Sequence, residues 1–474
     1  STQSQNGTEA TVNVSLTNLD AQELAKDLCR EIYRDSLSYS HSDYDIHSAF
    51  SLMKECLERN DYPAKTTTAT IHLTSENDVW TIDSTPELED DLTGGLVSYL
   101  SDPYLLSPED ILDLTLAMVS TELYEGNRKA IGHPACHILP LMLAQNEKEQ
   151  TLGTFLKNFV AAYEIASRWG ASIRFTHDIL GHGTVMTTGA TVAEGLYRGA
   201  DATELYEALL LTGSLPEVSV WQSVWDGSRL HDAYAGIAAC KAKQAYDLLS
   251  KGVRSTGKLV RSVYQDVLGA TITEETLAAG LGTNYFLLSN YYKIHTGCRF
   301  VHPFADVVQK ELADGLDKER IASISVYTYK KAARLTAQHV PNKLAGQFSI
   351  PVSLAVLLEK GELSPDTITA CVDDPAVLAW EGRITLYEDE AYNKLLPDTR
   401  GGRVEFHFKN GETKTVEVFH ARGDFDNPDP FTTEDVVQKF KQNVGGIVAD
   451  ERADALVGLI LEGGADDPFF IDFK

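Results

Sequence analysis

The sequence predicts a mainly helical protein, in which a large all-helical domain is joined to a smaller mixed α+β domain. Two observations lead to this prediction. Almost every segment from residue 107 to about residue 292 has the apolar spacing of an amphipathic helix. The pattern then changes to alternating strand segments with an Asn-Gly turn, and it becomes helical again after residue 433. No fixed-period repeat and no run of about 18 apolar residues is present, so we expect no solenoid and no membrane span.

The N-terminal part is less regular. We expect residues 1–17 to be a disordered leader, because they are polar, rich in Thr and Ser, and lack the layout of a signal peptide. Amphipathic helices are expected at 21–37 and around 49–57. Residues 66–82 alternate and are rich in Thr, Val and Ile, which predicts a small hairpin that turns around 75–78.

The helical domain is expected to span residues 18–290 and to be completed by residues 431–474. Its first well-marked helix begins at Pro108, where proline suits the first helical position behind the capping Ser107. Many of the following segments are rich in Ala and Gly, which suits close packing of helices. Further periodic runs are Leu152–Trp169, Thr184–Gly199, Ala202–Leu211, Tyr234–Ser250 and Gly257–Val267.

The α+β domain is expected to span residues 291–430. Residues 321–329 alternate as a strand, and residues 350–359 have the composition of a buried helix. Residues 403–419 form two strand patterns joined by Asn410-Gly411, which is a strong hairpin signal.

Composition limits the classes of function. The chain has 474 residues with 41 Lys and Arg against 69 Asp and Glu, a formal net charge of -28. Such a charge disfavours broad nucleic-acid binding and attachment to anionic lipid, since both need a positive surface. Six scattered cysteines without a C-x-x-C pair are typical of reduced thiols, so we expect a cytoplasmic protein with no nucleic-acid or membrane partner.

No Walker loop, G-x-S-x-G, H-E-x-x-H or helix-opening G-x-G-x-x-G is present. Four clusters of polar residues do, however, interrupt the otherwise apolar segments of the sequence. The first is 132–137, which leads into an apolar helix. His133 outside a helix N-terminus could help to bind a carboxylate, and Cys136 with His137 could indicate zinc. We disfavour zinc because those two residues share one helical turn and no second ligand pair follows. Locally, a capping His133 and a packed His137 are the favoured interpretation.

The other clusters are similar in kind. His182 lies between two glycines before a helix, where a site and a simple turn with a cap are equally favoured. Residues 225–231 are best interpreted locally as a polar loop that caps a helix. The fourth cluster places Lys293, His295, Arg299 and His302 within ten residues of a strongly acidic chain. Such a cationic island is a better functional indicator than one histidine, and its aromatic lead-in disfavours the alternative of a solvated loop.

In order and spacing these clusters resemble the MmgE/PrpD superfamily, which includes 2-methylcitrate dehydratase, cis-aconitate decarboxylase and iminodisuccinate epimerase. The resemblance covers about 107–460, and the co-linear order of its motifs is more specific than any one of them. The segments that carry it are GHPACHILPLMLA (132–144), GHGTVMTTGATVAEGLYRGAD (181–201), SRLHDAYAGIAACKAKQAYDLLSKGV (228–253), YKIHTGCRFVHPFADVV (292–308), AGQFSIPVSLAVLLEKGEL (345–363) and GDFDNPDPFTTEDVVQKF (423–440).

The resemblance implies an all-helical domain with a smaller α+β lid, a homodimer, and an active site between the domains that uses no metal or organic cofactor. Carried over by position, His133 and His182 match the active-site histidines, Lys293 matches the lysine at the domain crossing, and His231 matches the L-H histidine.

The chain departs from the family pattern at four places. Ser228, beside Arg229, replaces a lysine, and residues 124–127 (Tyr-Glu-Gly-Asn) replace an acidic D-D-T segment. Val352 stands where a tyrosine is frequent. A tyrosine of the decarboxylases, near the end of the first lid strand, falls close to Ala333. These departures leave the substrate open.

The expected activity is that of a cofactor-independent lyase, a dehydratase or decarboxylase acting on a small di- or tricarboxylate such as 2-methylcitrate or cis-aconitate. An epimerase or isomerase of an acidic dicarboxylate and a catalytically silent paralogue are the alternatives. Because the net charge repels a polycarboxylate, its attraction must be local. The predicted catalytic residues are His133, His182 and Lys293, and the predicted substrate-binding residues are Arg299, Arg229, Ser228, His231 and Asn127.

Overall fold

The computed structural model describes residues 2–6, 9–19, 64–76, 79–83, 108–145, 150–445 and 447–469. It divides into two compact units, Ser1–Leu106 with Asp472–Lys474, and Ser107–Ile471. The helices expected at 21–37 and 49–57, and the capping Ser107, lie outside the described residues.

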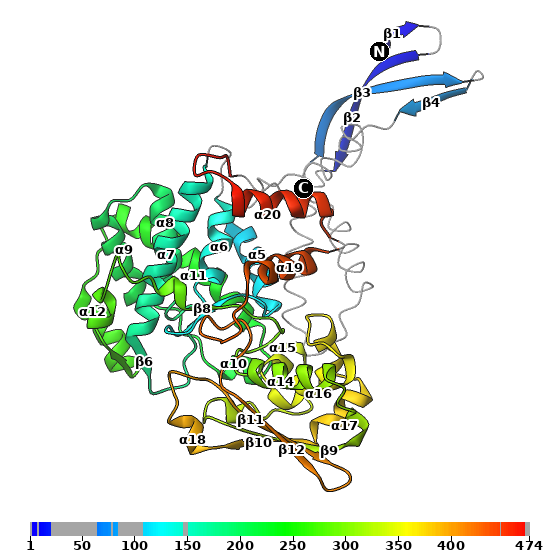
Figure 1. Ribbon diagram of the computed structural model, residues 1–474. Coiled ribbons are helices and arrows are strands. Elements are labelled where there is room, and N and C mark those ends of the chain that lie inside the picture. The colour runs from blue at the N-terminus through cyan, green and yellow to red at the C-terminus, as the bar shows by residue number, and fades with distance from the viewer. Residues whose placement is uncertain are drawn as a thin grey trace. The chain divides into compact units, whose positions relative to one another are not determined.

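The described part of the first unit is an antiparallel sheet of four strands (Figure 1). Strands β3 and β4 form the hairpin that the alternation of 66–82 predicts. The strands pair in sequence order and are β1 (Thr2–Asn6), β2 (Glu9–Leu19), β3 (Ala64–Glu76) and β4 (Val79–Asp83).

Strands β1 and β2 stand where a disordered leader was expected at 1–17, which corrects that expectation. The polarity of the segment was misleading because threonine is β-branched and favours strands. Val12, Val14 and Leu16 also recur at every second position, as on one face of a strand. Thr17 and Thr66 are register partners whose hydroxyl oxygens lie 2.9 Å apart.

The second unit begins with the predicted helices. Small side chains allow them to pack closely: Ala235, Ala238, Ala239 and Ala242 of one helix are all almost completely buried. The helices of this part are α5 (Pro108–Ser120), α6 (Ala135–Ala144), α7 (Leu152–Ser172), α8 (Thr187–Arg198), α9 (Ala202–Ser214), α10 (Gln222–Trp225), α11 (Leu230–Ser250), α12 (Gly257–Arg261), which continues as a π-helix to Val267, and α13 (Glu275–Ala278). Two short pairs, β5 (Gly126–Asn127) with β8 (Asn290–Tyr291) and β6 (Ile173–Phe175) with β7 (Ala270–Ile272), join distant loops.

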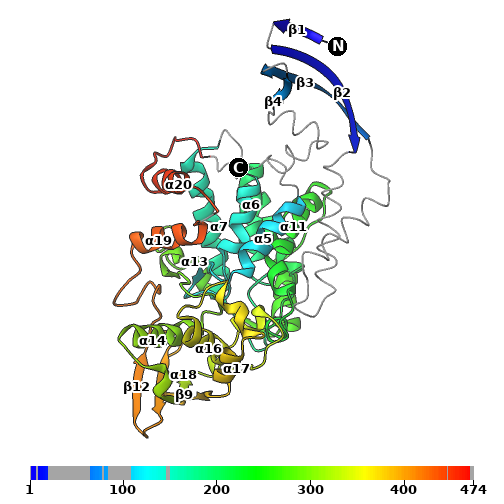
Figure 2. The same ribbon diagram turned by 90° about the vertical axis from the view of Figure 1, so that its right-hand side faces the viewer.

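The α+β part is built on a mixed sheet in the order β10-β9-β11-β12. Strand β9 (Ile321–Thr328) pairs in parallel with β10 (Ile384–Glu388) and antiparallel with β11 (Gly402–Phe408). The hairpin of β11 with β12 (Thr413–Val418) is the one predicted from Asn410-Gly411. Figure 2 shows this sheet and the helices α5, α6 and α11 at opposite ends of the unit.

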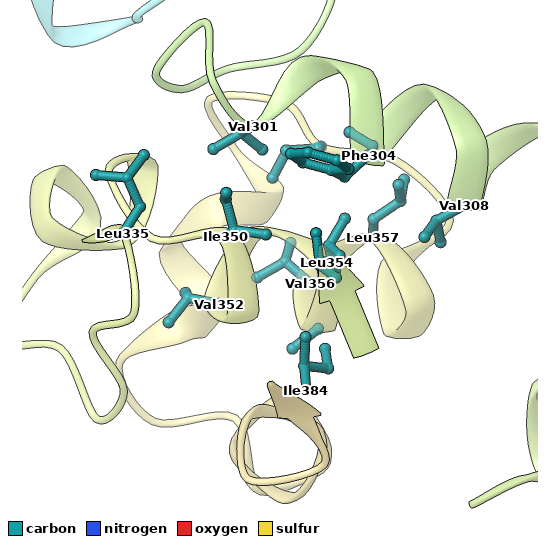
Figure 3. Packing of buried hydrophobic residues seen from close by; sticks show 14 of the residues in the cluster. Val301, Phe304, Val308, Leu335, Ile350, Val352, Leu354, Val356, Leu357 and Ile384 are labelled. Carbon is teal, nitrogen blue, oxygen red and sulfur yellow. The ribbon is translucent and has the colours of Figure 1, made fainter. Parts of the chain in front are cut away.

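Helices α14 (His302–Ala313) and α16 (Ile350–Lys360) supply the core of this part. Figure 3 shows Phe304 and Val308 packed with Leu354 and Leu357, all almost completely inaccessible to solvent. Val352 belongs to the same core, so the tyrosine-to-valine departure lies in packing. The remaining helices here are α15 (Lys343–Gln347), α17 (Pro375–Glu381) and α18 (Glu390–Asn393).

The C-terminal helices α19 (Thr433–Val444) and α20 (Asp450–Glu462) return to the helical part. The ring of Phe469 lies 4.4 Å from that of Phe155, and the Lys439 ammonium donates a hydrogen bond of 2.8 Å to the Leu123 carbonyl. Residues 107–471 form one compact unit, so the expected boundary at residue 290 does not separate two compact units.

Candidate active site

A cleft with a volume of about 850 Å³ lies within the second unit. Its walls come from the loops around 127–133 and 174–182, from 291–300, and from segments 329–334 and 396–400 of the α+β part. Nine Lys or Arg residues line it, against four Asp or Glu residues. The cleft therefore has the opposite charge sign to the chain as a whole, and it satisfies the need for local attraction of an anion.

Three histidines from distant segments meet at the inner wall of this cleft. His133 precedes α6, His182 precedes α8, and His231 lies in the first turn of α11. The His182 ring lies 5.1 Å from that of His133 and 5.0 Å from that of His231, measured between centroids. The structure thus brings together all three histidines that the sequence places in the site.

The ring of His133 has a defined tautomer. Its Nδ1 lies 2.6 Å from the Glu125 carbonyl oxygen, which only accepts, so Nδ1 carries the hydrogen and Nε2 keeps a lone pair. Burial holds the pKa of His133 well below its usual value, and the nearby Lys293 adds to this effect. His133 is only partly buried, whereas His182 and His231 are almost inaccessible. It is therefore a neutral base that a ligand in the cleft can reach.

Gly126 makes room for this arrangement. A Cβ atom at that position would lie 2.8 Å from His133 Nδ1 and 2.2 Å from the Tyr291 hydroxyl oxygen. Those distances are far below van der Waals contact, so any side chain there would displace the histidine or the tyrosine. This explains a glycine in the loop where the family pattern is acidic.

Lys293 is held by Glu122, a residue that the sequence analysis did not select. The Lys293 ammonium donates to the Glu122 carboxylate, and both side chains are 1% exposed. The Tyr124 hydroxyl donates to the same carboxylate, and the ammonium lies 4.0 Å from the centre of the Tyr124 ring. Glu122 has a φ of 51°, a left-handed conformation that costs a non-glycine residue energy and clusters at functional sites.

Glu122 also lies close to His231. His231 Nε2 lies 3.8 Å from the Glu122 carboxylate, while Nδ1 lies 3.3 Å from the Asp232 carboxylate. One buried carboxylate thus binds the lysine and the tyrosine, while His231 Nε2 lies near it without a hydrogen-bond partner among the described residues. The only sequence signal for Glu122 is its position just upstream of the altered 124–127 segment.

The zinc interpretation can be tested on the donor atoms. The fold brings His182 to Cys136 and His137, so three possible metal ligands lie within 4.8 Å of one another, which the sequence argument did not foresee. However, His137 Nδ1 lies 2.9 Å from the His133 carbonyl oxygen, and His137 Nε2 accepts a hydrogen bond of 3.1 Å from the Gly183 amide. Both ring nitrogens are engaged, as expected for the packed histidine of the local interpretation.

The basic residues of the cluster 293–302, which were expected to act together, have different partners in the structure. The Arg299 guanidinium lies 2.7 Å from the Asp424 carboxylate and also donates to the Tyr292 carbonyl, so it lines the cleft as part of an ion pair. His295 Nε2 lies 2.9 Å from the Asp306 carboxylate. Burial holds the pKa of His302 well below its usual value, so that ring is neutral. Lys293 and Arg299 line the cleft, whereas His295 and His302 do not.

Three further predicted residues have local roles. Ser228 and Arg229 do not line the cleft; the Arg229 guanidinium, which is about half exposed, lies 3.4 Å from the Asp232 carboxylate. Asn127 does line the cleft, but its amide donates to the Phe286 carbonyl and accepts from the Lys129 amide. Its polar atoms are therefore used in holding the loop.

Tyr329 lines the cleft and was not among the predicted site residues. It directly follows β9, four positions before Ala333, where the family tyrosine was expected. Its hydroxyl is buried and has no hydrogen-bond partner among the described residues. A buried polar group without a partner in a cleft wall is available to a ligand.

Comparison with known proteins identifies the family of the chain. The MmgE/PrpD N-terminal domain matches residues 114–264, and the MmgE/PrpD C-terminal domain matches residues 295–462. No curated protein matches the chain. None of the described helices has the length and apolar character needed to cross a membrane. The two matches cover most of the chain in the expected order, and the chain belongs to the MmgE/PrpD family.

Proposed function

We propose that this protein is a lyase that acts, without a cofactor, on a small di- or tricarboxylate such as 2-methylcitrate or cis-aconitate. Its family domains support a dehydratase-like or related activity in general. The observation that carries the finer proposal is the neutral, accessible His133 in a cationic cleft of an acidic chain. This combination suits proton transfer at a carbon next to a carboxylate.

The proposed chemistry follows from the tautomer of His133. Its Nε2 lone pair takes a proton from the carbon next to a carboxylate, while Nδ1–H stays on the Glu125 carbonyl and supports the imidazolium that forms. The electron pair of the broken C–H bond forms the double bond, and the hydroxyl group on the neighbouring carbon leaves as water with the proton that the imidazolium returns. In a decarboxylation, the C–C bond to the departing CO₂ breaks and its electron pair stays on the carbon, which takes a proton from a water molecule; the neutral His133 relays that proton, because Nε2 accepts it from the water and the imidazolium then delivers it to the carbon.

Positive charge in the cleft stabilises the carboxylate as electron density moves onto it. The Lys293 ammonium is fixed by Glu122 and Tyr124, so it does not need to reorganise during the reaction. The Tyr329 hydroxyl can donate to a substrate oxygen, because no described residue competes for it.

Proton NMR in D₂O with 2-methylcitrate, cis-aconitate and related acids tests the proposal. A lyase converts one of them to product, whereas the alternative epimerase incorporates deuterium at the reacting carbon without net loss of substrate. His133→Asn should abolish either signal, because asparagine can keep the hydrogen bond to Glu125 but cannot act as the base. His177→Asn is the matched control, since His177 is an exposed histidine of the same cleft.

Two outcomes contradict the proposal. If no acid is turned over or exchanged, and the unfolding temperature does not move with any of them, the chain is not such an enzyme. If the His133→Asn variant keeps its activity, the reaction does not use this base. Activity that is lost equally in both variants would show only that histidines of the cleft are needed for folding.

A further inference from the structure

The cations that line the cleft include two groups that differ in their partners. The Arg334 guanidinium binds the Asp178 carboxylate through two hydrogen bonds of 2.7 and 2.9 Å. Arg299 is likewise paired with Asp424, and Lys293 with Glu122. Each of these cations has a carboxylate of the protein beside it, so each pair adds little to the long-range attraction of an anion, although its cation can still contact a bound substrate.

The second group is Arg174, Lys331 and Arg400. None of the three has an ion-pair partner among the described residues. The Arg174 guanidinium donates hydrogen bonds of 3.1 and 2.7 Å to the Ala171 and Ile173 carbonyls, and Arg400 donates one of 3.1 Å to the Arg128 carbonyl. Carbonyl oxygens orient a guanidinium without cancelling its charge, so all three cations keep a full positive charge.

These three charges lie close enough to oppose one another. Although the side chains of Lys331 and Arg174 are exposed, partial loss of hydration in the cleft lowers the pKa of Lys331, and the nearby Arg400 and Arg174 lower it further. Partial loss of hydration, followed by the charge of Arg400, likewise lowers the pKa of Arg174. A group of like charges is unfavourable unless an anion binds among them, and guanidinium and ammonium groups together form strong hydrogen bonds with a carboxylate.

These three cations come from both parts of the unit. Arg174 belongs to β6 of the helical part, Lys331 follows β9, and Arg400 precedes β11 in the α+β part. Arg174 and Lys331 are exposed and Arg400 is half-buried, whereas the histidines and Lys293 lie deeper. The group therefore stands at the mouth of the cleft and is contributed by both parts of the unit.

We propose that Arg174, Lys331 and Arg400 form an anion subsite that binds the distal carboxylate of a substrate whose reacting carbon lies at His133. The second half of this statement rests on the proposed function, whereas anion binding by the three cations does not. The subsite selects acids with at least two anionic groups, and a bound anion links the helical part to the α+β part.

Isothermal titration calorimetry with three unreactive acids tests the subsite. Tricarballylate, glutarate and butyrate carry three, two and one carboxylates. Arg400→Gln should weaken tricarballylate and glutarate binding by about tenfold or more, as expected for the loss of a charge-assisted hydrogen bond, and leave butyrate unchanged. Arg400→Lys should recover part of the affinity because it keeps the charge. The double variant Arg334→Gln with Asp178→Asn is the matched control, since it removes an ion pair of the cleft without a change in net charge, and it should leave all three acids unchanged.

Each result of these titrations either supports or overturns the proposed subsite. Equal losses in the Arg400→Gln protein and in the double variant, an equal loss for butyrate, or no binding of tricarballylate at about 10 mM would overturn the subsite. Comparing glutarate with 4-phosphonobutyrate shows whether the distal group is a carboxylate or a phosphonate. Selective binding without any turnover or exchange in D₂O would keep the subsite and reject the proposed lyase.

Discussion

Replacing Lys293 by methionine separates its role in stability from its role in activity. Methionine has a similar length but no charge, so it leaves the Glu122 carboxylate buried without its ammonium partner. Removing one member of a buried ion pair costs roughly 3–5 kcal/mol. We therefore expect the free energy of unfolding of Lys293→Met to fall by about that amount, measured from urea unfolding curves.

The double variant Lys293→Met with Glu122→Gln completes the experiment. Glutamine can still accept from the Tyr124 hydroxyl but carries no charge, so most of the lost stability should return. Activity in the D₂O assay should stay absent in the single and the double variant, because the cation is missing in both. The control Lys310→Met removes an exposed ion pair with Asp314 and should leave the unfolding midpoint unchanged.

The reasoning is refuted by either of two results. If Lys293→Met unfolds at the urea concentration of the unaltered protein, the pair does not carry a buried charge. If the double variant regains activity together with stability, the lysine acts only by keeping the site folded, and it contributes nothing to the chemistry.

Three other changes test the surroundings of His133. Burial raises the pKa of Glu125 from 4.5 to about 7, so the folded protein binds this proton more tightly than the unfolded chain, and stability is lost as the pH rises between those values. In Glu125→Gln, the free energy of unfolding, measured with urea, should therefore fall by on the order of 3 kcal/mol less between pH 5 and pH 8 than in the unaltered protein. Gly126→Ala should disturb the His133–Tyr291 contact and abolish activity, seen as shifted histidine ring signals in NMR. Tyr329→Phe should leave stability unchanged or slightly higher, because the hydroxyl has no described partner to lose, while raising KM or lowering kcat; an unchanged enzyme would remove Tyr329 from the site.

Local pattern determined much of the fold before any tertiary contact was known. Helix α5 begins at Pro108, and β11 and β12 turn at Asn410-Gly411, because these signals act over a few residues. Strands β1 and β2 escaped prediction because the pairing of β2 with β3 joins residues 45 to 65 positions apart, and a threonine-rich segment resembles a disordered leader.

The order of the motifs likewise predicted one site for His133, His182, His231 and Lys293, and these four residues line one cleft in the structure. It could not identify Glu122, which is recognisable only by the lysine that it binds across 171 residues of chain. It also overrated the run from Lys293 to His302, since neighbours in sequence took different partners in space.

The distribution of charge shows most clearly what the sequence determines and what only the tertiary structure decides. The sequence alone determined a net charge of -28, and it predicted that a polycarboxylate substrate would need a local cationic site. Only the tertiary structure decided where that site lies, because Coulomb energies depend on distance in space and on which cations already have a carboxylate beside them. Arg174, Lys331 and Arg400 are far apart in the sequence, and folding alone brings them to one cleft and leaves them without ion-pair partners among the described residues.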